Sequence, residues 1–187
     1  ELEENCSLSG INKAPSIVDE PKLRWLSGEY IRAMGAEEFK AVALPFLQRS
    51  KAYGKYDEAK LLRMLQSRVD VLEDIPSKID FLEEYGDIDS ALYFNKKMKS
   101  DAEIAKAVLP AAAEVLKNLE KFENAELYAA LVALAQEKGM KNGQVLWCVR
   151  IALTGRENTP GGASEMAELL GRERSLERLA HAMELLA

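Results

Sequence analysis

The most informative stretch of the chain is 145–162, VLWCVRIALTGRENTPGG, in which an apolar segment runs into a glycine-rich turn. On a helix that turns about 100° per residue, Trp147 and Ile151 fall opposite the main apolar stripe, so apolar side chains cover nearly every side. A helix that is apolar all round is buried in a protein core. Arg150 is the single charge in its middle, and the stretch therefore predicts a buried helix that carries a cation.

The turn after this helix predicts a second helix start. Gly155 should end the first helix, and Thr159-Pro160 should open the next, because proline suits the first turn of a helix. Such a start presents unpaired N–H groups and a positive dipole end, which suit a phosphate or a base acceptor. Gly161 and Gly162 would let a ligand approach the backbone. The alternative is an ordinary helix start without a ligand, which Thr-Pro pairs also form.

The rest of the chain predicts an all-α fold. Ala, Leu, Glu, Lys and Arg dominate, and no stretch alternates between apolar and polar residues with the period of a strand. Pro45 should kink or bound the second helix. The predicted helices cover about 19–34, 36–49, 56–74, 101–119, 123–138, 142–155, 159–171 and the residues from 172 onward.

A change of pattern divides the chain into two parts. Residues 84–101 hold a glycine, a weak apolar pattern and a basic cluster, unlike the amphipathic segments on either side. We therefore predict two consecutive helical subdomains, 1–95 and 96–187.

Composition narrows the class of protein. The chain has 187 residues, a net charge of −6 and no apolar run long enough to cross a bilayer. Its first residues are acidic and lack a methionine, so we expect no secretory signal and a fragment or processed chain. Cys6 and Cys148 form no CxxC pair, which favours a reduced, cytoplasmic protein. The negative charge argues weakly against unspecific nucleic-acid binding but permits a local basic site.

No set of residues predicts catalysis by this chain alone. His181 is the only histidine and is expected at the surface, and the pair Glu83-Glu84 is most simply a solvated face. No Ser/His/Asp set, zinc ligand cluster or phosphate-binding glycine loop occurs. We expect no metal site and no catalytic residue here.

Arg68 is oddly placed on the helix predicted over 56–74. The apolar stripe of that helix consists of Leu61, Leu65, Val69 and Leu72, extended sideways by Met64, Val71 and Ile75. Arg68 falls inside this apolar arc, where an unpaired guanidinium is costly. Either its head reaches water or an internal carboxylate while its stem packs, or it is aimed at a ligand. The pattern leaves both open.

The first predicted helix carries two stripes. One is apolar and is predicted to face the core: Leu23, Leu26, Tyr30 and Met34. The other places an aromatic ring among charges: Lys22, Trp25, Glu29 and Arg32. Tryptophan between two cations can stack on a base beside phosphate contacts. A partly buried Trp25 between subdomains is the alternative, and the residues alone favour it.

Two segments resemble bacterial-type glutamyl-tRNA synthetases. NKAPSIVDEPKLRWLSGEYIR, Asn12 to Arg32, is similar to the segment that follows the catalytic core in that family. VLWCVRIALTGRENTPGG, Val145 to Gly162, is similar to a second family motif, and ELLGRERSLERL downstream resembles the family's last helix pair. The segments occur in the family's order, and the likeness covers nearly the whole chain.

The resemblance implies an all-helical, two-part anticodon-binding region that binds tRNA(Glu) and acts as a monomer, and it leaves tRNA(Gln) open as a further partner. In the family, a separate Rossmann domain uses ATP and Mg²⁺ to join glutamate to the tRNA. The ATP motifs of that domain are absent here, so the resemblance implies a non-catalytic piece of the ligase without a cofactor of its own.

The resemblance also implies site residues. Arg68 matches the position that inspects the third anticodon base, and Arg68 also suggests an enzyme strict for tRNA(Glu). The other positions implied to contact the RNA are Lys22, Trp25, Arg32, Lys141, Arg150, Thr159, Pro160 and Gly161. Ser27 replaces the family's asparagine, and the bulky apolar residue often found near Gly162 is missing. The rival interpretation is a helical protein-interaction scaffold, which explains the amphipathic helices but not the two ordered motifs.

Overall fold

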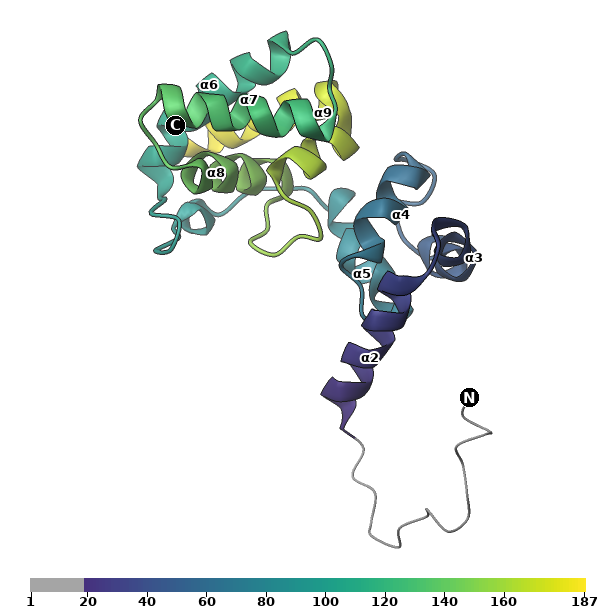
Figure 1. Cartoon of the computed structure of the whole chain (residues 1–187). Helices are drawn as coiled ribbons and strands as arrows, with labels where there is room; N and C mark the ends of the chain where they lie inside the picture. Colours follow the sequence, from purple (N-terminus) through teal and green to yellow (C-terminus); the bar gives the residue numbers. More distant parts are fainter. Residues whose placement is uncertain (1–18) are drawn as a thin grey trace, which may run out of the picture.

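The computed structural model describes residues 19–187, and these residues form helices joined by turns (Figure 1). Within that range the only β-type pairing is an isolated bridge between Asn95 and Ser100. The all-α prediction is confirmed. Cys6 and the first part of the Asn12–Arg32 motif lie outside the described residues.

The first group of helices runs from α2 to η3. Its elements are α2 (Glu20–Ala33), α3 (Ala36–Leu47), α4 (Glu58–Gln66), η2 (Leu72–Asp74), α5 (Ile75–Ile79) and η3 (Asp80–Leu82). Helix α3 packs against α4, α5 and η2. Aspartates begin two of these helices, because a side-chain oxygen satisfies a free N–H of the first turn. Asp19 accepts from the Lys22 N–H at 3.1 Å, and Asp57 accepts from the Lys60 N–H at 2.9 Å.

The second group is a bundle of four helices that all pack on one another. They are α6 (Ala102–Asn118), α7 (Asn124–Glu137), α8 (Asn142–Thr154) and α9 (Ala163–Leu186). Helix α8 is buried on nearly all sides, as its apolar sequence predicts. Gly155 ends it in the left-handed conformation, with φ 65°, and Gly171 interrupts α9 with φ 77°. Both glycines were predicted to end helices, and both provide backbone angles that other residues rarely adopt.

The connection between the groups packs mainly on the second one. The short helix η4 (Ser90–Tyr93) contacts α6 and α8, and the indole Nε1 of Trp147 donates to the Leu92 carbonyl at 3.2 Å. The division of the chain at residue 95 stays a prediction.

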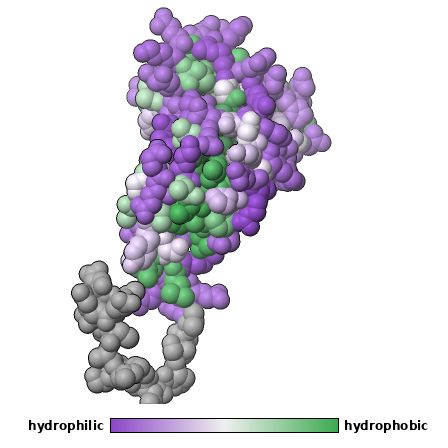
Figure 2. All heavy atoms as spheres, turned by 90° about the vertical axis from the view of Figure 1, so that its right-hand side faces the viewer, coloured by the Kyte–Doolittle hydropathy of each residue, from purple (hydrophilic) through white to green (hydrophobic). Residues whose placement is uncertain are grey.

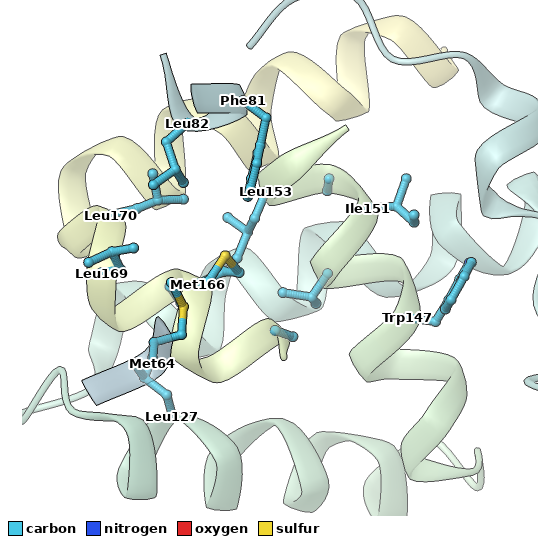
Figure 3. Packing of buried hydrophobic residues seen from close by; sticks show 14 of the residues in the cluster. Met64, Phe81, Leu82, Leu127, Trp147, Ile151, Leu153, Met166, Leu169 and Leu170 are labelled. Atoms are coloured by element: carbon cyan, nitrogen blue, oxygen red, sulfur yellow. The ribbon is translucent and has the colours of Figure 1, made fainter. Parts of the chain in front are cut away.

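The two groups share one continuous hydrophobic core. Helix α4 packs on α9, and Met64 of α4 extends toward Leu127 and Met166 of the second group (Figure 3). Glu168 on α9 accepts from Arg63 on α4 at 2.8 Å at the same junction. The first group is therefore fixed against the bundle by apolar and ionic contacts.

The helix predicted over 56–74 is interrupted. Helix α4 ends at Gln66, and the chain turns before η2 and α5 continue. At the turn Ser67 donates to the Met64 carbonyl at 3.2 Å, while Val69 is buried. Serine and aspartate compete with helix hydrogen bonds in this way. The predicted position of Arg68 inside a helical apolar arc is thus wrong, because Arg68 lies in the turn and is exposed.

The helix after Gly155 begins later than predicted. Helix α9 starts at Ala163 with Gly162 as its N-cap residue, so Thr159-Pro160 belongs to the preceding loop. Thr159 donates its hydroxyl to the Gly161 carbonyl at 2.7 Å, and the Gly162 N–H donates to Glu165 at 2.8 Å. A glutamate three residues beyond the cap satisfies one of the free donors, which places the true start at Gly162.

Most of the apolar stripe predicted to face the core on α2 is exposed, whereas Met34 at its end is partly buried and packs against the core. Leu23, Leu26 and Tyr30 are 55%, 44% and 66% exposed, because α2 contacts the body through Gly28 and Ile31 instead. Helix α2 projects from the rest of the molecule (Figure 1). Figure 2, which views the side where α3 lies, shows apolar side chains gathered toward this end of a mostly hydrophilic surface. The helical period identified the apolar face but not what covers it.

No helix among residues 19–187 combines the length and the apolar character that a membrane span requires.

Candidate nucleic-acid interface

A pocket of about 230 Å³ lies between the two helical groups. One wall comes from the first group and consists of Arg68, Ser77, Lys78 and Phe81. The other wall is the loop between α8 and α9, with Arg156, Asn158, Thr159 and Pro160. The structure therefore brings Arg68 next to Thr159 and Pro160, although about 90 positions separate Arg68 from this pair in the sequence. All three are predicted site residues.

Three cations give this pocket a basic lining. Arg68 and Lys78 form no ion pair with any residue that the structure describes, and no carboxylate within 19–187 lines the pocket. The guanidinium carbon of Arg156 lies 5.5 Å from the centre of the Phe81 ring. A guanidinium nitrogen of Arg156 lies 3.5 Å from a carboxylate oxygen of Glu84. On a protein whose net charge is −6, such a pocket concentrates positive potential where an anion can enter.

A second, larger pocket surrounds Arg150. It has a volume of about 480 Å³ and is mostly apolar. Its lining includes Met98, Tyr128 of α7 and the start of α9 at Gly162–Glu165. Helix α8 contributes Leu146, Trp147 and Arg150. An apolar pocket with aromatic walls and one cation is a suitable place for a planar base.

Arg150 itself is half-buried and incompletely satisfied. Its guanidinium lies over the Trp147 ring, with Cζ 4.7 Å from the centroid, and its Nε is buried without a hydrogen-bond partner among the described residues. Burial lowers the pKa of Arg150, while the charge of Glu157 opposes this effect. A donor of this kind carries a desolvation cost that a bound acceptor would remove.

One loop separates the two pockets. Thr159 and Pro160 line the pocket of Arg68, and Gly162 to Glu165 line the pocket of Arg150. Gly161 between them is buried, and a Cβ there would lie 2.6 Å from the Met166 methyl and 3.0 Å from the Met64 sulfur. Glycine at this position lets the loop pack closely on the core, a reason that the sequence did not reveal.

The two cations considered on α2, Arg32 and Lys22, differ in their surroundings. Arg32 donates to Asp70 at 3.0 Å and to Glu29 at 2.9 Å, and the hydrogen bond with Asp70 contributes most to raising its pKa. Lys22 is exposed, and Trp25 is 59% exposed rather than held between subdomains. The buried alternative for Trp25 is wrong, and its ring is open to a partner.

Lys141 precedes α8 and is exposed. Its backbone N–H donates to the side chain of Gln144 at 2.9 Å, and Gly143, two residues on, lines the pocket of Arg150. The lysine therefore lies at the N-terminal end of α8, close in sequence to a residue that lines this pocket.

Several lining residues were not identified from the sequence. Lys78, Arg156 and Tyr128 lie on separate elements, and no local motif links them to Arg68 or Arg150. Arg156 could have been found, because it stands inside the quoted 145–162 stretch as the first charge after Arg150. Lys78 and Tyr128 carry no such signal.

Other titratable groups lie apart from the two pockets. His181 is partly exposed, with its Nε2 3.8 Å from Asp87. Cys148 is buried and free, and burial is the main cause that raises the pKa of its thiol. Within the described residues no three histidine, cysteine, aspartate or glutamate side chains are placed to hold a metal ion.

The family to which the chain is related follows from comparison with known proteins. A family model described as "Anticodon binding domain" matches residues 36–183, which include both pockets. The chain belongs to this anticodon binding domain family. The resemblance to the anticodon-binding region of glutamyl-tRNA synthetases is confirmed by its relatives.

Among the curated relatives of this anticodon binding domain are glutamate–tRNA ligases. That of Clostridium tetani is 39% identical over 174 residues, covering 93% of this chain and 36% of the relative. That of Lachnoclostridium phytofermentans is 38% identical over 188 residues, covering 100% of this chain and 38% of the relative. The chain thus spans a little over a third of the length of these relatives.

Solved structures share the fold. A glutamate tRNA ligase from Elizabethkingia meningosepticum, solved in complex with its amino acid, aligns with a TM-score of 0.73 at 20% identity. The alignment covers 97% of this chain and 36% of that chain. The glutamate–tRNA synthetase of Elizabethkingia anophelis aligns with a TM-score of 0.69, also at 20% identity. The anticodon binding domain therefore has the helical arrangement of these structures.

Proposed function

We propose that this domain binds the anticodon loop of tRNA(Glu) as the RNA-recognition part of a glutamate–tRNA ligase. The observation that carries the proposal is the pocket between the helical groups, which joins Arg68 to Thr159 and Pro160 and to which residues 19–187 contribute no carboxylate. Anticodon bases are unstacked and offer free Watson–Crick edges, which arginine can read and aromatic rings can stack on. The RNA backbone supplies the negative charge that the unpaired cations attract.

The proposed roles follow from exposure and chemistry. Arg68 reads the third anticodon base, and Arg150 with Trp147 receives another base in the larger pocket. Lys78 and Arg156 contact phosphate at the smaller pocket, together with the loop residues Thr159, Pro160 and Gly161.

Further contacts are proposed for exposed side chains outside the lining of the two pockets. Lys22 and Lys141 contact phosphate, and the open ring of Trp25 stacks on a base. Arg32 joins them only by exchanging Asp70 or Glu29 for a phosphate, because both carboxylates already occupy its guanidinium.

The wider assignment concerns the whole ligase. We propose that glutamate, ATP and Mg²⁺ are bound by a catalytic part outside this chain, and that the domain works as a monomer in the cytoplasm. The buried free thiol of Cys148 fits a reducing compartment. The arginine at position 68 favours an enzyme selective for tRNA(Glu) over tRNA(Gln).

A binding experiment with anticodon stem-loops tests the proposal. Arg68→Gln should lower the preference for the cognate third base, since bidentate arginine contacts contribute roughly 1–3 kcal/mol of base discrimination in duplex DNA. The control is Arg49→Gln, another exposed arginine, which packs over Phe46 away from the pockets. Equal selectivity of Arg68→Gln and the unmodified chain would reject the role of Arg68. Affinity should also fall as salt rises, and a flat response would contradict phosphate contacts.

A protein-interaction scaffold is the second candidate, and the exposed stripe of Leu23, Leu26 and Tyr30 on α2 favours it. A native gel shift with total tRNA and with a panel of acidic proteins separates the two. A shift with the proteins and none with tRNA would support the scaffold.

A further inference from the structure

Arg178 is a buried arginine that pairs with no carboxylate among residues 19–187. It lies on the second half of α9, is 9% exposed and forms no ion pair with the described residues. Its guanidinium instead donates to two backbone carbonyls, that of Leu82 at 2.5 Å and that of Leu153 at 2.7 Å. Leu82 ends η3 of the first helical group, and Leu153 is the next-to-last residue of α8. One side chain therefore bridges both groups.

Tyr85 completes this bridge. Its ring lies 4.2 Å from the Arg178 Cζ, and its hydroxyl is 2.8 Å from the Ala152 carbonyl and 3.0 Å from the Arg178 carbonyl. The hydroxyl proton can be donated to one of these oxygens at a time. The segment after η3, the end of α8 and the second half of α9 are thus held together by polar contacts at one point.

The bridge lies directly behind the pocket of Arg68. Leu82 follows Phe81, which is part of the first wall, and the backbone after Leu153 leads into the loop that forms the second wall. A shift of Leu82 relative to Leu153 would move the two walls apart or together. The bridging contacts thus link segments that lead into the two walls.

We infer that Arg178 is a positioning residue that sets the spacing between the Arg68 wall and the Thr159 wall of the RNA pocket. This inference rests on the proposed function for its effect on RNA, but the geometry that it predicts can be measured without RNA.

The chemistry explains why an arginine is used. Leu153 is among the last carbonyls of α8, which have no partner within the helix, and a cation suits the negative end of the helix dipole. Burial is the main cause that lowers the pKa of Arg178, so its charge carries a desolvation cost. A packed apolar side chain would avoid that cost but could not donate to carbonyls on both sides.

Arg172 provides a matched control on the same helix. It donates to the carbonyls of Leu116, Lys117 and Leu119 at the end of α6, so its contacts stay within the second group. Arg172→Met and Arg178→Met both remove an arginine that satisfies the end of a helix. Only Arg178→Met removes a bridge between the groups.

The first measurement is a distance between the groups. Spin labels at Gln48→Cys on the end of α3 and Gln136→Cys on α7, in the 187-residue chain with Cys6→Ser, report the separation by double electron–electron resonance. We expect Arg178→Met to broaden or shift the distance distribution, whereas Arg172→Met leaves it unchanged. Unchanged distributions in both variants would overturn the inference. If Arg178→Met does not fold, the test uses Arg178→Lys. One ammonium group cannot hold both carbonyls in the same geometry, so this variant should also broaden or shift the distance distribution, but to a smaller extent.

The second measurement is binding of anticodon stem-loops by variants shown to be folded. Arg178→Met, or Arg178→Lys in its place, should lower affinity about tenfold and flatten the preference for the third base, whereas Arg172→Met changes both less than twofold. The positioning role would be overturned if the Arg178 variant kept its selectivity for the third base. It would also be overturned if the Arg178 variant and Arg172→Met lost equal affinity and selectivity. Failure of the unmodified chain to bind any stem-loop would contradict the proposed function instead, and the distance measurement would still test the bridge.

Discussion

The guanidinium of Arg150 lies 4.7 Å from the centre of the Trp147 ring, and its buried Nε has no hydrogen-bond partner among the described residues. Arginine over an aromatic face is attracted by the ring's negative face, by about 0.5–1 kcal/mol at exposed sites. The unpartnered nitrogen works against this gain. Such an arrangement is typical of a residue kept for a ligand rather than for stability.

Replacing Arg150 should therefore separate stability from binding. Arg150→Met keeps the packing of the stem and removes the desolvated charge, so the free energy of unfolding should stay the same or rise. Affinity for the anticodon stem-loop should fall at least tenfold. Chemical denaturation and fluorescence anisotropy measure the two effects. A large loss of stability with unchanged RNA binding would assign Arg150 to the core alone.

Lys78 should act through charge. Lys78→Ala should weaken binding of all stem-loop sequences about equally and reduce the dependence of affinity on salt by about one phosphate contact, because a phosphate contact carries no sequence information. Lys40→Ala is the control, since Lys40 pairs with Glu58 at 2.9 Å on another surface. A change in base preference, or no change in the salt dependence, would show that Lys78 does not contact phosphate.

The two neighbouring glycines of the loop should differ in their tolerance of a methyl group. A Cβ at Gly161 meets Met166 at 2.6 Å and Glu165 at 3.0 Å, whereas a Cβ at Gly162 finds its nearest neighbour, Glu165, at 3.6 Å. Overpacking a core costs about 1–3 kcal/mol, and the flexible methionine places Gly161→Ala near the lower end. Gly162→Ala should cost less than half as much. Thermal unfolding of both variants provides the comparison, and equal melting temperatures would contradict the packing argument.

Stability should fall at alkaline pH. Burial raises the pKa of Tyr56 and Tyr85 from 10.0 to about 12, so the unfolded chain loses these protons before the folded chain does. The contribution of these hydroxyls is complete below about pH 10 and is lost as the pH rises toward 12. Urea unfolding over this range measures how steeply the free energy of unfolding falls with pH. Tyr85→Phe should make this dependence shallower, because it removes one of the two hydroxyls whose pKa is raised.

The junction between α4 and α9 offers one further prediction. Glu168 is mostly buried and accepts from Arg63 at 2.8 Å and from the Asn124 N–H at 3.2 Å. Glu168→Gln keeps the shape but removes the charge, so the free energy of unfolding should fall by about 1–2 kcal/mol. Glu103→Gln is the control, because that carboxylate is well exposed. A loss in Glu168→Gln no larger than in the control would show that the ion pair does not hold the groups together.

The sequence by itself determined the elements that depend on local interactions. The all-α class, the buried helix α8 and the helix ends at Gly155 and Gly171 follow from periodicity and backbone freedom, which act within a few residues. The resemblance of two ordered motifs also identified the family correctly.

Only the tertiary structure decided which surfaces are covered and which residues meet. The stripe of Leu23, Leu26 and Tyr30 has the period of a core face, yet it is exposed, because its covering depends on where other helices lie. The basic pocket exists because the contacts between α4 and α9 and the bridge at Arg178 hold two distant segments together. Such long-range contacts depend on the packing of the whole fold, and no local pattern in the sequence encodes them.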